Sequence, residues 1–235
     1  MQLRFETAIS AVLATAGMLF ATAFAYRTFV GHRVGIEKDE LQVPEYVDKW
    51  RQIAAAGIRV GPHKAKVNIV EFGDIECPFC KTFHASVRAL QTKYPESVSL
   101  VFVHFPLTQH RFAIPAARAV ECADNSGRFA QLLDILFGKQ DSIGLKPWGS
   151  YALEAGVSDT VKFIECLSSP HFARIAAGLD AGKSLGVRGT PTVLLNGWRM
   201  PHAPSGAELD SITREILAGR SDLRPDRRDE SFAPL

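Results

Sequence analysis

The sequence predicts an α/β fold, and three features indicate it. A β-branched and aromatic run at residues 67–72 leads through a short loop into an amphipathic helix that begins near residue 77, and a second strand-like run follows at 98–103. Residues 112–182 then carry a series of helical patterns. A last strand pattern at residues 192–195 is bounded by Thr190-Pro191 and by an Asn-Gly turn. These elements predict an α/β domain with a helical segment inserted between its strands.

Composition limits the class of protein. The chain has 235 residues, of which 46% are hydrophobic and 22% charged, as expected of a globular protein with a full core. Its length suits one domain with extra segments, or two small domains. A net charge of +2 gives no reason to expect a nucleic-acid partner. The sequence contains no glycine-rich phosphate loop, HExxH zinc helix or GxSxG elbow.

Residues 1–34 are predicted to be a signal peptide or a membrane anchor. The stretch from Ala8 to Tyr26 carries no charge, and as a helix it would span about 28 Å of a bilayer core about 30 Å thick. Ala23-Phe24-Ala25 offers a cleavage site, whereas the length of the stretch and the adjacent Arg27 favour a retained anchor. In either case we expect a periplasmic or other extracytoplasmic location, where disulfides form and persist.

Three further segments complete the predicted organisation. Residues 35–65 are predicted to be a linker with a short helix, in which Trp50 and Ile53 form an apolar side. Residues 66–220 form the main domain. Residues 221–235 are charged and show no periodicity, which predicts a flexible tail.

The most informative motif is Cys77-Pro78-Phe79-Cys80. Proline is favoured as the first residue of a helix, so Pro78 places Cys77 at the N-cap. Free N–H groups and the dipole at a helix N-terminus stabilise an anion, and this lowers the pKa of a thiol held there. Cys80, one turn further, lies near the apolar face of the helix. An exposed thiolate at Cys77 and a sheltered thiol at Cys80 are what disulfide exchange requires.

The CxxC motif allows two other interpretations. Half of a zinc site would need further ligands, but Cys122 and Cys166 stand alone and the histidines show no zinc-finger spacing, so no metal site is predicted. A purely structural disulfide within the motif would add little stability, because the loop it closes is so short. His104 and His110 are predicted to be ordinary loop histidines.

The two motifs together resemble those of a known family. A strand that ends in an acidic residue six positions before a CxxC, with a later Thr-Pro-strand-Asn-Gly segment, resembles the thioredoxin superfamily. Within it, CPFC and the long intervening helical segment resemble the DsbA-like periplasmic oxidoreductases, over roughly Gly61 to Leu217. The resemblance implies a thioredoxin fold with an inserted helical domain at about residues 110–182, preceded by the N-terminal signal or anchor helix.

The resemblance also implies a substrate-binding surface. Pro191 would be a cis-proline packed against the active-site cysteines, where it would keep metals away from both thiols. Thr190 and Pro191 would form a ledge on which an extended substrate segment hydrogen-bonds through its backbone. Pro78 and Phe79, which lie between the two cysteines, are expected to contact substrate as well.

Glu71 is the third expected catalytic residue. It matches the buried acid that lies beneath the second cysteine in such proteins, and a desolvated carboxyl group with a raised pKa would move a proton to or from Cys80. The alternative is an exposed carboxylate at the end of a strand. Asp74 and Glu76 are predicted to be solvated loop charges.

Redox work by Cys77 with Cys80 leaves Cys122 and Cys166, both within the inserted helices, as an expected structural disulfide. Such a bridge would close a loop of about 45 residues, which corresponds to about 4 kcal/mol of stabilisation by the chain-entropy relation. Two inert buried thiols, or a second redox relay, are the alternatives.

The predicted function is that of an exported thiol–disulfide oxidoreductase with no bound cofactor. It would introduce disulfides into unfolded or partly folded secreted proteins that have free cysteines, and a quinone-linked membrane partner would reoxidise it. Phe79 lacks the charge that a histidine, frequent at this place in DsbA-like enzymes, would lend the Cys77 thiolate, so the direction stays open. A disulfide reductase or isomerase is one alternative, and a membrane-tethered binding or chaperone module is another.

Overall fold

The structure, a computed structural model, describes residues 18, 20–27 and 43–220. Contacts divide the chain into two units, residues 1–42 and 43–235. Residues 18 and 20–27 of the first unit are helical, while the rest of the predicted signal or anchor segment and the predicted tail at 221–235 lie outside the described residues. Within the described ranges, no helix has the length and apolar character needed to cross a membrane.

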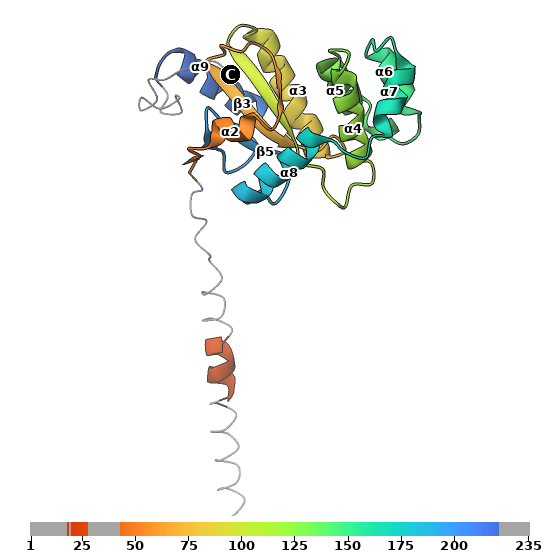
Figure 1. The fold of residues 1–235 in the computed structure, drawn as a ribbon. Helices are drawn as coiled ribbons and strands as arrows, with labels where there is room; N and C mark the ends of the chain where they lie inside the picture. The colour runs from red at the N-terminus through yellow and green to blue at the C-terminus, as the bar shows by residue number, and fades with distance from the viewer. Residues whose placement is uncertain (1–17, 19, 28–42, 221–235) are drawn as a thin grey trace, which may run out of the picture. The chain divides into compact units, whose positions relative to one another are not determined.

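The second unit is built on a six-stranded mixed sheet (Figure 1). Its order is β1-β6-β5-β3-β4-β2, in which β3 and β4 are parallel and every other neighbouring pair is antiparallel. The strands are β1 (Glu45–Tyr46), β2 (Ile58–Val60), β3 (Val67–Gly73), β4 (Val98–His104), β5 (Thr192–Leu195) and β6 (Trp198–Arg199). The central strand β3 is buried along its whole length, so both of its faces are covered.

Helices cover both faces of this sheet. They are α3 (Pro78–Lys93) and α9 (Gly206–Leu217) on one face, and α2 (Trp50–Ala54) and α8 (Ala173–Leu185) on the other. Side chains alternate along a strand, so Ile69 packs in the core with α3 and α9 whereas Val70 packs with α2 and α8. The same alternation puts Glu71 on the α3 face, directly behind the helix that carries the CxxC motif.

Residues 43–60 differ from the predicted linker with a short helix. The expected helix is present as α2, but it is flanked by β1 and β2, which form the two edges of the sheet. In β2, Ile58 pairs with Phe102 of β4 in antiparallel register. These strands have two and three residues, too few to produce a recognisable alternation in the sequence, and they are ordered by the strands beside them.

The inserted helices lie between β4 and α8 and share one core. They are α4 (Ala113–Asp124), α5 (Phe129–Gly138), α6 (Trp148–Glu154) and α7 (Thr160–Leu167), with a 3-10 turn at Gln140–Ser142 after α5. The core that holds Leu132, Leu136 and Tyr151 also contains Cys80 and Phe102. The insertion therefore packs directly onto the CxxC region. By contrast α8, most of which lies within the range predicted for the insertion, packs against the sheet in the same core as α2.

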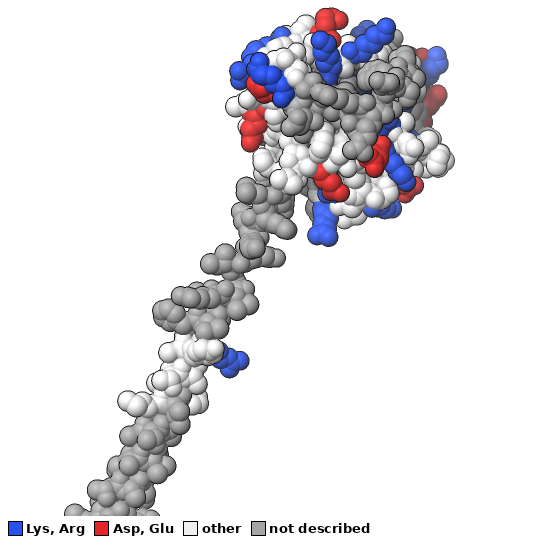
Figure 2. Space-filling view, turned by 90° about the vertical axis from the view of Figure 1, so that its left-hand side faces the viewer, with Lys and Arg blue, Asp and Glu red and all other residues white. Residues whose placement is uncertain are grey.

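The surface of the domain is mixed in charge. On the face shown in Figure 2, Lys and Arg side chains are interspersed with Asp and Glu side chains, as the nearly balanced composition leads one to expect. Phe79 is the exposed apolar side chain within the CxxC motif, with 73% of its surface accessible. An aromatic ring held in water beside a reactive thiol is available for contact with another molecule.

Candidate active site at the start of helix α3

The two cysteines of the CxxC motif lie where β3 ends and α3 begins. Cys77 is the N-cap of α3 and Pro78 its first residue, as the sequence predicts. The amide of Cys77 donates to the carbonyl of Asp74, and the amide of Asp74 lies 3.5 Å from Cys80 Sγ. Both cysteines are free thiols. Cys80 is buried as expected, but Cys77 is only 4% exposed, so the prediction of a well-exposed thiolate at Cys77 is wrong.

Segments far away in the sequence cover Cys77. Its Sγ atom lies 3.3 Å from the carbonyl oxygen of Thr190, to which the protonated thiol donates, and Cys77 packs in the core that the inserted helices form. The Thr190-Pro191 peptide bond is cis. Thr190 and Pro191 are half-buried, whereas Pro78 and Phe79 are exposed. The structure thus brings the expected substrate ledge and the CxxC motif together at one place.

The environment of Cys77 favours its thiolate. A hydrogen bond with the Cys80 thiol is the largest influence, and it acts against the effect of burial. The Thr190 side chain and the backbone N–H groups of Phe79 and Cys80 act in the same direction as the Cys80 thiol. Together they lower the pKa of Cys77 to about 5. The two backbone donors are free N–H groups of the first turn of α3, which is the effect predicted from the sequence. Cys77 is therefore ionised at neutral pH.

Cys80 and Glu71 have raised pKa values, in contrast to Cys77. Burial, followed by the hydrogen bond to Cys77 and the negative charge of Glu71, raises the pKa of Cys80 far above that of an ordinary thiol. Glu71 is fully buried, and neither of its carboxylate oxygens has a partner at hydrogen-bonding distance. Burial raises the pKa of Glu71 to about 8, with the nearby Cys80 thiol limiting the rise and the charge of Cys77 adding to it. Glu71 is thus protonated at neutral pH, and it lies next to Cys80, whose thiol is protonated as well.

Asp74 is not the solvated loop charge that was predicted. Its side chain is buried, and its carboxylate accepts hydrogen bonds from the backbone amides of Glu76 and Leu107. The same carboxylate lies 2.7 Å from Nδ1 of His110. Glu76 is partly buried and accepts from the amide of Phe112. The loop after β4 therefore folds over the residues before Cys77. The local sequence does not predict this contact.

His104 is not a loop histidine either. It is the last residue of β4, it is buried, and its Nε2 lies 2.9 Å from Glu121 on α4. This pair links the sheet to the inserted helices. Among the residues that the structure describes, no group of three or more His, Cys, Asp or Glu side chains is arranged to hold a metal ion.

Gln140 is a site residue that sequence reasoning missed. Its side-chain amide donates to the carbonyl of Ile75 at 2.8 Å and to the carbonyl of Cys77 at 2.9 Å. It lies in the 3-10 turn after α5, more than 60 residues from the motif it contacts. No pattern in the sequence connects a single glutamine to a distant loop, so only the packing of the insertion against the sheet reveals it.

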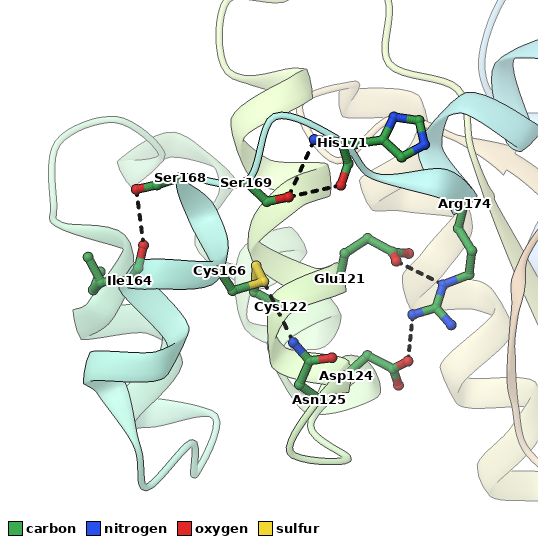
Figure 3. Close-up of a disulfide and its surroundings, with 10 residues drawn as sticks. All are labelled: Glu121, Cys122, Asp124, Asn125, Ile164, Cys166, Ser168, Ser169, His171 and Arg174. Carbon is green, nitrogen blue, oxygen red and sulfur yellow. Dashed lines mark hydrogen bonds and ion pairs between the residues drawn. A yellow bond between two sulfur atoms is a disulfide. The ribbon is translucent and has the colours of Figure 1, made fainter.

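The remaining cysteines form the expected disulfide (Figure 3). Cys122 of α4 is joined to Cys166 of α7, across a sequence separation of 44 residues. Beside it, Arg174 pairs with Glu121 and with Asp124, so α8 is tied to α4 next to the bridge. The disulfide links the first and last of the inserted helices and lies apart from the Cys77–Cys80 pair in the chain.

Comparisons with known proteins agree with this fold and site. The family model described as thioredoxin matches residues 54–214. A thioredoxin-like oxidoreductase from Silicibacter pomeroyi has 25% identity and a TM-score of 0.59, with 71% of this chain and 94% of that chain covered. DsbA2 from Pseudomonas aeruginosa has 26% identity and a TM-score of 0.55, with 68% and 93% covered.

The curated relatives that match carry a different name, that of Na(+)/H(+) antiporters. The Na(+)/H(+) antiporter NhaA 1 of Salinispora arenicola is 35% identical over 177 residues, which are 72% of this chain and 27% of the antiporter. The chain thus spans about a quarter of the length of that relative. The family match, the fold and the paired cysteines at the start of α3 agree with one another. The chain belongs to the thioredoxin family, as a DsbA-like member of the superfamily whose chemistry is thiol–disulfide exchange.

Proposed function

We propose that the protein introduces disulfides into substrate proteins by exchange at Cys77 and Cys80. The observation that carries this proposal is the buried Cys77 thiol with its pKa of about 5. A stable thiolate stabilises the reduced form of a dithiol, and the disulfide form then becomes a stronger oxidant. At pH 7 a pKa of about 5 favours the reduced form by roughly 2.7 kcal/mol over an unshifted thiol, which corresponds to roughly 60 mV.

The exchange starts from the Cys77–Cys80 disulfide. A substrate thiolate attacks Cys77 Sγ, the bond between the two active-site sulfurs breaks, and Cys80 leaves with the electron pair. The substrate is now joined to Cys77 in a mixed disulfide. A second substrate thiol, once deprotonated, attacks the substrate sulfur of this bond and releases Cys77 as a thiolate. The substrate has gained a disulfide, and the two electrons remain on Cys77 and Cys80.

Glu71 supplies the proton that Cys80 takes up on leaving. Because the pKa of Glu71 is raised to about 8 and that of Cys80 is raised further, the carboxyl group carries a proton at neutral pH and the thiolate of Cys80 is the stronger base. Transfer of this proton removes a buried negative charge from Cys80. After the transfer Glu71 takes up a proton from solvent, and in reoxidation it first releases that proton to solvent and then accepts the proton of Cys80 as Cys80 attacks.

Substrate contact is assigned to the surface around Cys77. Phe79 presents an exposed aromatic ring within the CxxC motif, and Thr190, which precedes Pro191 through a cis peptide bond, lies against the Cys77 sulfur. An unfolded protein exposes apolar side chains and unpaired backbone groups. Phe79 would contact the apolar side chains of such a substrate, while the Thr190-Pro191 ledge would bind its extended backbone.

An extracytoplasmic location belongs to the same proposal. The apolar stretch from Ala8 to Tyr26 would direct export or serve as an anchor. The Cys122–Cys166 disulfide supports it, because structural disulfides persist in oxidising compartments. A membrane partner coupled to quinones would remove the two electrons from Cys77 and Cys80. The antiporter name belongs to the longer relative, and no ion transport is proposed for this chain.

The reduction potential of the Cys77–Cys80 pair tests the direction of exchange. A variant with Cys122→Ala and Cys166→Ala leaves one titrating pair, which is equilibrated with glutathione buffers. A value nearer to about −120 mV, as in a strong oxidant, supports the proposal, whereas one near about −270 mV, as in a cytosolic reductant, overturns it.

The alternative direction is reduction or isomerisation of wrong disulfides, and Phe79, which lends no charge to Cys77, favours it. A potential near about −270 mV would be its signature. A binding or chaperone module is separated from both enzymes by Cys77→Ser. This variant should lose exchange completely if the protein is an oxidoreductase, and it should keep its function if exchange is incidental.

A further inference from the structure

The surroundings of Cys77 are acidic. Asp74 and Glu76 precede it by three and one residues, and Asp74 is buried. Negative charge close to a thiol disfavours the thiolate. Phe79, inside the motif, brings no positive charge. A cation from another part of the fold would offset this negative charge and add to the hydrogen bonds that already favour the Cys77 thiolate.

The loop after β4 places a histidine at this point. His110 Nδ1 lies 2.7 Å from the Asp74 carboxylate, which is itself held by the amides of Glu76 and Leu107. The side chain of Asp74 is wholly buried, whereas that of His110 keeps 22% of its surface exposed. A buried carboxylate with fixed donors is a strong partner for an imidazolium, because the negative charge is desolvated and its position is set.

We propose that protonated His110, held by Asp74, is the positioning residue that stabilises the Cys77 thiolate and sets the pH range in which the Cys77–Cys80 pair is strongly oxidising. This inference rests on the proposed exchange at Cys77 and adds a pH control to that site. His110 acts through charge and contributes no atom to the exchange.

The titration of His110 agrees with this arrangement. Burial is the largest single influence and lowers the pKa of His110, but the bond to Asp74 and the charges of Asp74, Cys77 and Glu76 together outweigh it, so the pKa is raised. Interaction free energies are reciprocal. If the Cys77 thiolate stabilises the His110 imidazolium, the imidazolium stabilises the thiolate by the same free energy. His110 stabilises the Cys77 thiolate while the imidazole is charged, and this stabilisation is lost as the pH rises through the raised pKa of His110.

The test uses His110→Gln, whose amide can still donate to Asp74 but carries no charge. Thiolate absorbance between about pH 3 and pH 8 reports the ionisation of Cys77. Half ionisation of Cys77 in the variant should require a proton concentration roughly three- to tenfold lower than in the parent. The equilibrium constant with which the variant oxidises glutathione should fall by a similar factor at about pH 6. At about pH 9 the two proteins should agree, because His110 of the parent is then neutral and the glutamine of the variant never carries a charge.

Two further variants separate charge from structure. His110→Lys keeps a cation near Asp74 and should restore most of the thiolate stability, now also at about pH 9. His202→Gln removes an exposed histidine that pairs with Glu208, and it should change nothing. An unchanged Cys77 titration in His110→Gln, or a loss that is equal at every pH, would overturn the inference. The titration needs no protein substrate. A result that contradicts the role of His110 is therefore distinguishable from one that contradicts the proposed oxidase function.

Discussion

The sulfur of Cys77 lies 3.3 Å from the carbonyl oxygen of Thr190, although 113 residues separate the two in the chain. Antiparallel pairing of β5 with β3 brings them together, since Thr192 is opposite Phe72 and the start of β5 therefore lies beside the end of β3. The ledge proposed for substrate is therefore part of the environment that sets the acidity of Cys77.

Replacing Thr190 by Val should weaken the Cys77 thiolate without removing the ledge. The Thr190 side chain helps to lower the pKa of Cys77, while the carbonyl that accepts from the thiol is kept. Thr190 Oγ1 is buried with no other hydrogen-bond partner among the described residues, so its loss breaks no further bond. We expect the pKa of Cys77 to rise by up to about one unit, measured by thiolate absorbance. Thr92→Val, in the exposed part of α3, is the control, and an equal shift there would contradict the prediction.

Replacing Glu71 by Gln should make the protein more stable and its chemistry slower. The folded pKa of about 8 exceeds the unfolded value of 4.5, so the folded state holds more protons and loses stability as the pH rises between these values. At pH 7 the gain from the neutral amide is about 3 kcal/mol, and it should vanish near pH 4. Urea unfolding at both pH values measures it.

Exchange by the Glu71→Gln variant should slow because no proton reaches Cys80 from the carboxyl group. Stopped-flow reduction by a small dithiol measures this rate. Glu96→Gln, an exposed carboxylate before β4, should change neither stability nor rate. A Glu71→Gln variant that exchanges at the rate of the parent would remove Glu71 from the proton pathway.

Replacing Gln140 by Ala should loosen the turn that carries Cys77. The change removes two hydrogen bonds, to the carbonyls of Ile75 and Cys77, and we expect a loss of about 1–3 kcal/mol of unfolding free energy. Hydrogen exchange of the amides at residues 76–80 should become faster. Gln131→Ala, an exposed residue of α5, is the matched control. Unchanged protection at residues 76–80 would show that the insertion does not hold the motif.

Replacing Cys122 and Cys166 by Ala should cost stability and leave exchange intact. The disulfide closes a loop of 44 residues, for which the loss is expected to be about 2–4 kcal/mol. Denaturant unfolding and the rate of dithiol oxidation are compared with those of the parent. A variant of full stability that had lost its exchange activity would instead identify this pair as a second redox relay.

Much of the site is encoded locally. Pro78 and the apolar spacing of the following residues place Cys77 at a helix N-cap, and a run of strand-forming residues places Glu71 behind that helix. Both inferences depend on neighbours within a few residues, where helix capping and the two-residue period of a strand operate. The helices α4 to α7 were predictable for the same reason, because each carries its own periodicity.

The edge strands and the loop contacts were not predictable in this way. β1 and β2 are too short to show a pattern, and they become strands because β6 and β4 offer unpaired edges. From the sequence Asp74 is predicted to be a solvated loop charge, because no basic side chain stands close to it in the chain. Its partners Leu107 and His110 are more than 30 residues away.

By itself the sequence determined the CxxC helix, the buried strand with Glu71, the inserted helices and, through its likeness to a family, the pairing of Cys122 with Cys166. Tertiary structure alone decided that Cys77 is covered, that Thr190 lies against its sulfur, and that Gln140 and His110 hold the surrounding loops. The reason is physical. Helix capping and strand alternation act over a few residues, whereas burial and charge pairing depend on which distant segments the sheet register and the packing of the insertion bring together.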